Sequence, residues 1–315
     1  MTRARLRAWW EGEDFDAEAA AAAIANDSAP ETGDADRELF DEPPFDLPPR
    51  LTALSRLWGE GRIRPGDATS EALDPARVDL QADGVLALLS PGLIAPVAAV
   101  AGVHPGKIEV FEWREETLEA LKYGVRKASL EDRVSVTRID IEAHIFTPNH
   151  YDGLISIDDI AYTSFPPHFA QQVMKCLKPG ACAVIECYAG LPSAELATAF
   201  ASSFAEPQIR AHGDVLQHFS EVGLKLESDE DLTEEFLAHA REGFRRLGEA
   251  LGDAAKFDAD MARELAWEAE AWKMRLKLLA QRRLERRRFV FRRPADSAAP
   301  EVAPAQAETA NAPQG

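Results

Sequence analysis

The sequence predicts an α/β fold in which helices cover both faces of a mostly parallel sheet. Short apolar runs typical of strands alternate with amphipathic helical runs along the middle of the chain. The strand-like runs lie at 84–89, 107–111, 133–139, 151–157, 181–188, 224–228 and 287–291. Alternation of this kind produces a sheet whose ligands bind at the carboxyl ends of its strands.

Helical runs separate the first five of these strands. The clearest are 115–128 and 166–180, and the second ends in a Lys-Pro-Gly stop in which Gly180 is expected to take the left-handed cap conformation. Apolar residues recur at helical spacing over 231–251 and again over 261–287. The sequence therefore predicts a helical excursion before the last strand.

The two ends of the chain differ in composition from the middle. Residues 1–49 hold a short aromatic segment and then an acidic, proline-rich arm, with too little apolar surface to fold alone. The aromatic segment contains Leu6, Trp9, Trp10 and Phe15, which predict a short docked helix or a partner-binding element. Residues 294–315 form a proline- and alanine-rich tail that we expect to be disordered. The folded domain is predicted over 50–293.

Composition narrows the class of protein. Of the 315 residues 46% are hydrophobic, enough for a sizeable core, and no apolar stretch approaches the ~20 residues that cross a bilayer. The N-terminal arginines are not followed by the apolar segment of a leader, so we expect a cytoplasmic protein. Cys176, Cys182 and Cys187 lack a C-x-x-C pair, which argues against a zinc site and against disulfides.

Charge is distributed unevenly along the chain. The net charge of −19 argues against general affinity for nucleic acid. Between Lys273 and Arg293, however, ten basic residues accompany one glutamate, whereas Glu11 to Pro49 holds 13 acidic residues and one arginine. The basic segment is either solvated surface or the binding surface for an anion, which could be a lipid headgroup, RNA or the chain's own acidic arm.

The order of elements, with "LKPGACAVIE" entering the fifth strand and a final strand after a helical excursion, resembles the class I S-adenosylmethionine-dependent methyltransferases. It is most similar to the bacterial methyltransferase-domain proteins that act on small molecules. The resemblance covers about 84–294. It implies a Rossmann-like sheet of seven strands, with the segment near Phe289–Phe291 antiparallel and inserted beside the fifth strand.

The resemblance also implies a set of residues that bind S-adenosylmethionine. Glu112 would bind the ribose hydroxyls, because a carboxylate accepts two hydrogen bonds from a diol; alternatively, it is an ordinary acid at a helix start. Asp140 would lie near the adenine amino group, with Ile141 packed on the ring. Ser90 and Gly92 belong to the first loop of the site, and the resemblance implies no metal.

Candidate catalytic residues follow from the same resemblance. Asp158 and Asp159 end the fourth strand, where the family lines the mouth of the cofactor and substrate site, although a helix cap explains one of them. With Tyr162 and Tyr188, they could position an amine or hydroxyl acceptor or take its proton. Asp158 is expected to contact the cofactor as well.

The first loop departs from the family pattern. Ala87 stands where the family has an acid, and Leu89, Ser90 and Pro91 replace the glycine-rich part. Proline removes a backbone donor, and Leu89 and Ile94 would bring side chains where the methionine end of the cofactor lies. Two hypotheses follow: an active methyltransferase for a small-molecule amine or hydroxyl, or a non-catalytic relative that serves as a partner subunit or regulator. A nicotinamide dehydrogenase is a weaker third, because G-x-G-x-x-G is absent.

Overall fold

The computed structural model describes residues 45–78, 80, 82–190, 208–250 and 259–295. The aromatic segment predicted near the N-terminus, most of the acidic arm and nearly all of the C-terminal tail lie outside the described residues.

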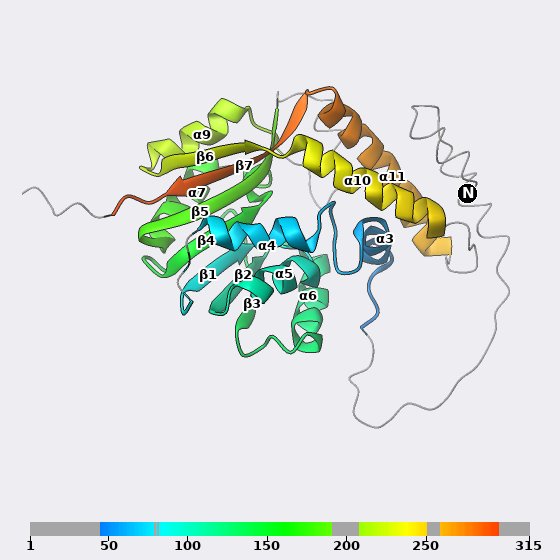
Figure 1. The fold of residues 1–315 in the computed structure, drawn as a ribbon, viewed down its shortest axis with the longest axis horizontal. Coiled ribbons are helices and arrows are strands. Elements are labelled where there is room, and N and C mark those ends of the chain that lie inside the picture. The colour runs from blue at the N-terminus through cyan, green and yellow to red at the C-terminus, as the bar shows by residue number, and fades with distance from the viewer. Residues whose placement is uncertain (1–44, 79, 81, 191–207, 251–258, 296–315) are drawn as a thin grey trace, which may run out of the picture.

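Seven strands form one sheet in the order β3-β2-β1-β4-β5-β7-β6 (Figure 1). They are β1 (Val85–Leu89), β2 (Lys107–Glu112), β3 (Val134–Arg138), β4 (Tyr151–Ile157), β5 (Leu177–Gly190), β6 (Lys225–Asp231) and β7 (Leu284–Arg292). Strand β7 lies between β5 and β6 and is antiparallel to both, while the other pairs are parallel. The predicted α/β fold and the antiparallel last strand beside the fifth are confirmed.

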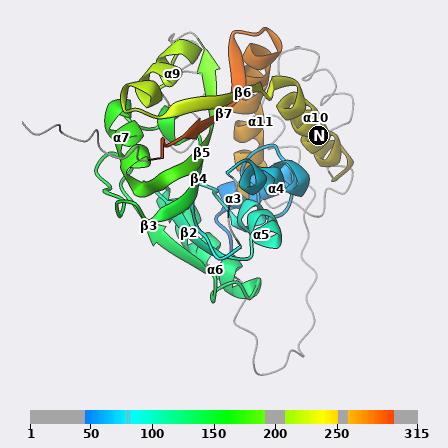
Figure 2. The same ribbon diagram turned by 60° about the vertical axis from the view of Figure 1, so that its left-hand side comes forward.

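Helices cover both faces of the sheet, as the sequence predicts. Helices α4 (Ala68–Arg77), α5 (Ile94–Val103) and α6 (Glu115–Lys127) lie on one face, and α7 (Pro166–Cys176) and α9 (His212–Glu221) lie on the other (Figures 1 and 2). Strand β1 shows why both faces are apolar. Leu88 packs with Val97 of α5, whereas Leu89 packs with Phe169 of α7, because successive side chains of a strand point to opposite faces.

Three further helices form a layer at the carboxyl ends of the parallel strands. They are α3 (Pro49–Trp58), α10 (Thr233–Ala250) and α11 (Ala259–Ala280) (Figure 2). The Trp58 ring lies 5.6 Å from the Phe244 ring and 4.5 Å from the Trp272 ring, so one tryptophan joins all three helices. Their apolar cluster also includes Leu93 and Tyr188 from the strand ends. The predicted helical excursion therefore packs over the edge of the sheet where ligands bind in such folds.

Two predicted boundaries are wrong. Helix α7 ends at Cys176, and the segment up to Gly180 belongs to β5, because Leu177 already pairs with Tyr151 of β4. Gly180 does have a φ of +84°, but its N–H donates to Arg293 O at 3.0 Å at the edge of the sheet and does not cap a helix. Similarly, α11 ends at Ala280 and β7 starts at Leu284, earlier than predicted.

Helices α3 and α4 were not predicted from the sequence, although Asp67 and Ser70 form a capping box at the start of α4. Cys176, Cys182 and Cys187 are free, buried thiols. No helix within the described ranges combines the length and the apolar character needed to span a membrane.

Candidate functional site

The candidate site lies where β1, β2 and β4 end. The turn after β1 begins at Ser90, whose φ is +56°, and continues to Gly92, whose φ is +86°. A Cβ atom on Gly92 would lie 2.5 Å from Cδ1 of Ile63, so glycine is required here both for the backbone angle and for space. The turn is therefore tightly packed, although it has only one glycine.

Glu112 ends β2 with its side chain completely buried. Its Oε1 accepts hydrogen bonds from the backbone N–H of Arg114 at 2.9 Å and from Arg114 Nε at 2.7 Å. Its Oε2 accepts from the N–H of Gly92 at 3.1 Å and from Arg114 Nη2 at 3.2 Å. Four donors thus occupy the two oxygens, and this arrangement leaves the carboxylate no exposed acceptor for a diol.

Arg114 connects the ends of β1 and β2. Its Nη2 also donates to Ser90 O at 2.7 Å, and its guanidinium lies 5.2 Å from the Trp113 ring. Burial by itself would lower the pKa of Arg114, but the attraction of the Glu112 carboxylate and its hydrogen bonds raise it. The side chain is 8% exposed. Arg114 is therefore a buried, charged part of the site that the sequence analysis did not identify.

Asp159 extends this polar network to β4. Its carboxylate accepts hydrogen bonds from Ser156 Oγ at 2.6 Å and from Ser90 Oγ. The side chain is fully buried, and this burial raises the pKa of Asp159 to about 6. Ser90, Gly92, Glu112 and Asp159, four of the predicted site residues, are thus brought together in one network.

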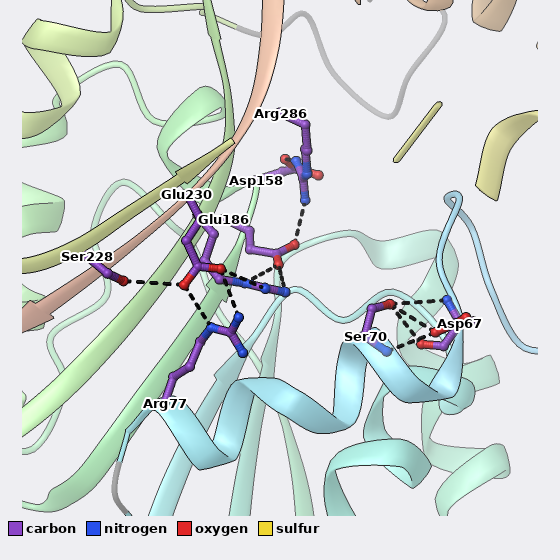
Figure 3. Close-up of polar contacts among 9 residues, drawn as sticks. Asp67, Ser70, Arg77, Asp158, Glu186, Ser228, Glu230 and Arg286 are labelled. Carbon is purple, nitrogen blue, oxygen red and sulfur yellow. Dashed lines mark hydrogen bonds and ion pairs between the residues drawn. The ribbon is translucent and has the colours of Figure 1, made fainter. Parts of the chain in front are cut away.

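Asp158 has a different environment. Its backbone adopts the left-handed conformation, with a φ of +69°. It precedes the short helix η1 (Asp159–Ala161), but its side chain makes no capping hydrogen bond to that helix. Its Oδ1 accepts a hydrogen bond from Arg286 of β7, and the same guanidinium donates to Glu186 Oε2 at 3.1 Å (Figure 3). The side chain of Asp158 therefore does not cap this helix, and its carboxylate belongs to an ion-pair network.

The two predicted tyrosines both lie at the apolar cluster formed by the three covering helices, with Tyr188 inside it and Tyr162 packed against it. Tyr188 is 5% exposed, and its ring lies 4.8 Å below the Arg286 guanidinium. Burial raises the pKa of Tyr188 to about 12, which makes it a poor proton acceptor at neutral pH. Tyr162 is half-buried, and its ring lies 4.9 Å from that of Trp113. The catalytic roles of these residues stay predictions.

Asp140 and Ile141 lie outside the buried network. Asp140 is exposed in the turn after β3, where its Oδ1 accepts a hydrogen bond from the N–H of Glu142 at 2.9 Å. Ile141 beside it is half-buried. Their contact with an adenine ring stays a prediction.

Leu89 and Ile94 both pack within the fold around the turn. Leu89 is the last residue of β1 and packs into the core on the α7 face, as strand alternation requires. Ile94 fits between Gly61 and Gly124, whose missing side chains leave space for it. That Leu89, Pro91 and Ile94 fill the methionine end of the cofactor site stays a prediction.

The segment between α3 and α4 covers the turn. Ile63 packs on Gly92, Arg64 Nη1 donates to Pro91 O at 3.0 Å, and Gly61 O accepts from Ala95 N at 3.0 Å. This covering segment was not predicted from the sequence. Its three glycines and one proline, in "GEGRIRPGD", indicate a loop but not what the loop contacts.

The basic segment identified in the sequence binds anions that belong to the folded domain. Arg287 pairs with Asp229 of β6, Arg288 pairs with Glu186 of β5 and Arg292 pairs with Glu227 of β6. Among the described residues there is no group of three or more acidic, histidine or cysteine side chains that could hold a metal ion.

No protein-family model matches the sequence, and no curated protein is significantly similar to it in sequence. Solved structures do match. A phosphoethanolamine N-methyltransferase 2 from Haemonchus contortus, crystallised with S-adenosylhomocysteine, has a TM-score of 0.66 at 20% identity. The match covers 78% of this chain but only 57% of that protein.

A putative sarcosine dimethylglycine methyltransferase from Galdieria sulphuraria has a TM-score of 0.65 at 13% identity, over 78% of this chain and 98% of that one. The [4+2]-cyclase SpnF has a TM-score of 0.62 at 15% identity, over 78% and 93%. The chain thus has the fold of the class I S-adenosylmethionine-dependent methyltransferases, as the resemblance implied. The two matching Haemonchus contortus structures contain S-adenosylhomocysteine in one case and S-adenosyl-L-methionine in the other.

Proposed function

We propose that this protein is a non-catalytic member of the methyltransferase fold, in which an internal arginine takes the place of the cofactor's ribose. The observation that carries the proposal is the occupancy of Glu112: Arg114 and the N–H of Gly92 supply four donors to its two oxygens. Such a protein would act as a partner subunit or regulator, and S-adenosylmethionine would bind only after Arg114 is displaced.

The cost of that displacement explains why binding would be weak. Glu112 is fully buried and Arg114 is 8% exposed. Separating them therefore leaves the Glu112 carboxylate buried without a cation and shielded from water. Breaking a buried ion pair typically costs about 3–5 kcal/mol, which corresponds to a loss of affinity of roughly 100-fold or more. The ribose would have to compensate for this cost with two hydrogen bonds.

The second candidate is methyl transfer to a small-molecule amine or hydroxyl. It is favoured by the position of Glu112 at the end of β2, where this fold carries its ribose-binding acid. Asp158 and Tyr162 follow β4 and are half-buried, and the Tyr162 ring lies 4.9 Å from that of Trp113, which follows Glu112 in the chain. In this candidate, Arg114 leaves Glu112 whenever the cofactor binds.

Calorimetric titration with S-adenosylhomocysteine distinguishes the two candidates, because this product needs no methyl acceptor. We expect no micromolar binding to the unmodified protein and measurable binding to an Arg114→Ala variant, whose Glu112 is available to the ribose. Thermal denaturation of the same variant should show stabilisation by the ligand, which also checks that the variant is folded.

An exposed ion pair supplies the control. Arg138 contacts Glu115 at 3.3 Å near the end of β3, and the two side chains are 57% and 77% exposed. An Arg138→Ala variant should behave like the unmodified protein in the titration. Micromolar binding by the unmodified protein would support methyl transfer and overturn the proposal. Absence of binding by a folded Arg114→Ala variant would show that Arg114 is not what blocks the site.

A further inference from the structure

A cavity lies on the α5 face of the sheet, and its lining includes no residue of the Glu112 network. It has a volume of about 40 Å³, several times the space that one water molecule needs. Helices α4, α5 and α10 and the middle of the sheet line it on several sides, and Leu88, Ile155 and Phe236 supply apolar walls. None of the residues predicted to bind the cofactor lines it.

Arg64 lines this cavity and uses few of its hydrogen-bond donors within the fold. A guanidinium has five N–H donors, and the one hydrogen bond of Arg64 among the described residues goes to Pro91 O at 3.0 Å. No carboxylate oxygen of the described residues lies within 4.0 Å of it. Burial lowers the pKa of Arg64, in contrast to Arg114 and Arg286, whose carboxylate partners raise theirs.

The other arginines of the cavity have carboxylate partners already. Arg286 binds Asp158 and Glu186, as Figure 3 shows, and Arg288 binds Glu186 with Nη2 at 2.5 Å. Each therefore has its charge neutralised within the fold.

The acidic residues of the cavity do not pair with Arg64. Glu71 attracts it electrostatically, but Glu71 Oε2 is held by Arg62 Nη2 at 2.8 Å. Glu235 is exposed at the start of α10. Asp158 and Glu186 also attract Arg64 electrostatically, but both are bound by Arg286. Arg64 thus has N–H donors left over beyond its hydrogen bond to Pro91 O.

We infer that this cavity binds a small organic carboxylate, with its carboxylate on Arg64 and a short apolar body against Leu88, Ile155 and Phe236. A planar carboxylate matches the fork of a guanidinium and would bind directly to a charge that the described carboxylates attract only from a distance. A branched chain of a few carbons suits the apolar walls and the small volume. None of Ser90, Gly92, Glu112, Arg114 and Asp159 lines this cavity, although Arg64 also donates to Pro91 O in the turn that holds Ser90 and Gly92. The inference goes beyond the proposed function.

Isobutyrate is a suitable probe, because isobutyramide has nearly the same shape without the charge. Titration of the full-length protein, followed by saturation-transfer NMR of the probe, should show saturable binding of isobutyrate. Isobutyramide should bind at least about tenfold more weakly, since it loses a charge-assisted contact.

Three variants assign the contact. Arg64→Met should weaken isobutyrate binding by about tenfold or more, and Arg64→Lys should retain part of it because the charge remains. Arg56→Met, at an exposed position on α3, is the control and should bind like the unmodified protein. If Arg64→Met does not fold, the comparison of isobutyrate with isobutyramide binding to the unmodified protein still tests whether the cavity recognises a carboxylate.

Equal binding of isobutyrate and isobutyramide would overturn the proposal, and so would a folded Arg64→Met variant with unchanged affinity. Absence of any saturable isobutyrate binding with a Kd below about 10 mM, which corresponds to a binding free energy of about 3 kcal/mol, would also overturn it. The Arg114→Ala variant should bind isobutyrate normally. The outcome is therefore separable from the S-adenosylhomocysteine titration.

Discussion

Arg114 and Glu112 contact each other through both carboxylate oxygens, although a single residue separates them in the chain. Glu112 ends β2, and Arg114 precedes the first turn of α6 with an extended backbone, at φ −76° and ψ 114°. This sharp change from strand to helix folds the arginine side chain back over the strand end. It is held there because its Nη2 also reaches Ser90 O in the neighbouring turn. The pair thus joins the ends of β1 and β2 without a ligand.

The pair should contribute strongly to stability. Arg114→Ala leaves a buried carboxylate with two backbone donors and no cation, so we expect the free energy of unfolding to fall by about 3–5 kcal/mol. The double change Glu112→Gln with Arg114→Met should cost less than Arg114→Ala, because no charge remains buried. Urea denaturation at pH 7 measures both. A loss below about 1 kcal/mol for Arg114→Ala, like that of the exposed Arg138→Ala, would show that the buried pair is not formed.

Gly92 should not tolerate a side chain. Its φ of +86° and the 2.5 Å distance from a Cβ to Ile63 Cδ1 predict that Gly92→Ala destabilises the protein by about 1–3 kcal/mol. Adding Ile63→Ala to Gly92→Ala should relieve the steric clash but not the backbone strain. A double-mutant cycle should therefore show a favourable coupling energy between the two substitutions. Gly102→Ala is the matched control on α5, where a Cβ meets nothing within 4 Å, and it should be neutral or stabilising. Equal effects of the two glycine changes would contradict the packing described for the turn.

Asp159 should make stability fall as the pH rises from about 4 to 6. Its pKa is about 6 in the folded chain, against 3.8 as the ordinary value, so the folded state binds more protons in this window. The shift corresponds to roughly 3 kcal/mol. Between pH 4 and 7 the unmodified protein should therefore lose roughly that much stability relative to an Asp159→Asn variant.

Asp152 offers a control of opposite sign. Although partial burial acts to raise its pKa, Lys178 and the backbone N–H of Val85 lower it. Relative to Asp152→Asn, the unmodified protein should therefore gain stability as the pH rises through the acidic range. Parallel pH profiles for the unmodified protein and Asp159→Asn would contradict the environment assigned to Asp159.

Glu186 should contribute strongly to stability, because its carboxylate pairs with two arginines of β7. It accepts hydrogen bonds from Arg286 Nη2 at 3.1 Å and from Arg288 Nε at 2.9 Å. Glu186→Gln leaves two buried cations with less neutralisation, and we expect a loss of about 3–5 kcal/mol in urea denaturation. Glu227→Gln, which removes the half-exposed partner of Arg292, should cost about 1 kcal/mol or less. Similar losses for both variants would indicate that burial does not determine the strength of these pairs.

Most of the fold could be predicted from the sequence, because each buried strand is a short apolar run and the runs are separated by turns or amphipathic helices. The boundaries at Gly180 and Leu284 could not. Lys178, Pro179 and Gly180 look like a helix stop, but Leu177 pairs with Tyr151, so pairing within the sheet ended the helix at Cys176. Tertiary hydrogen bonding decided this boundary against the local signal.

The charge of the basic segment could be predicted, but its partners could not. The acids at 227–231 and the arginines at 286–288 face each other only because β6 and β7 are neighbours and antiparallel. Matching the acidic strand "LESDED" with the basic strand "LERRRF" would have been a usable signal, since opposite charges favour cross-strand pairing.

Several site residues could be placed from the sequence, but their environment could not. Glu112, Ser90 and Asp159 lie at strand ends, as predicted. That Arg114 folds back onto Glu112, and that Ile63 and Arg64 cover the turn, depends on side-chain packing between segments far apart in the chain. No periodicity encodes such contacts, so the choice between an open and an occupied site could not be made from the residues alone.

The central claim is that Arg114 occupies Glu112 where the fold would bind ribose, and NMR of the arginine side chains tests it most directly. In protein labelled with ¹⁵N-arginine, the Nε–H signal of Arg114 can be assigned by its loss in an Arg114→Lys variant. The account predicts that this signal exchanges slowly with water and does not move when millimolar S-adenosylhomocysteine is added. A signal that exchanges rapidly without ligand, or that shifts and loses its protection when the ligand binds, would contradict the claim.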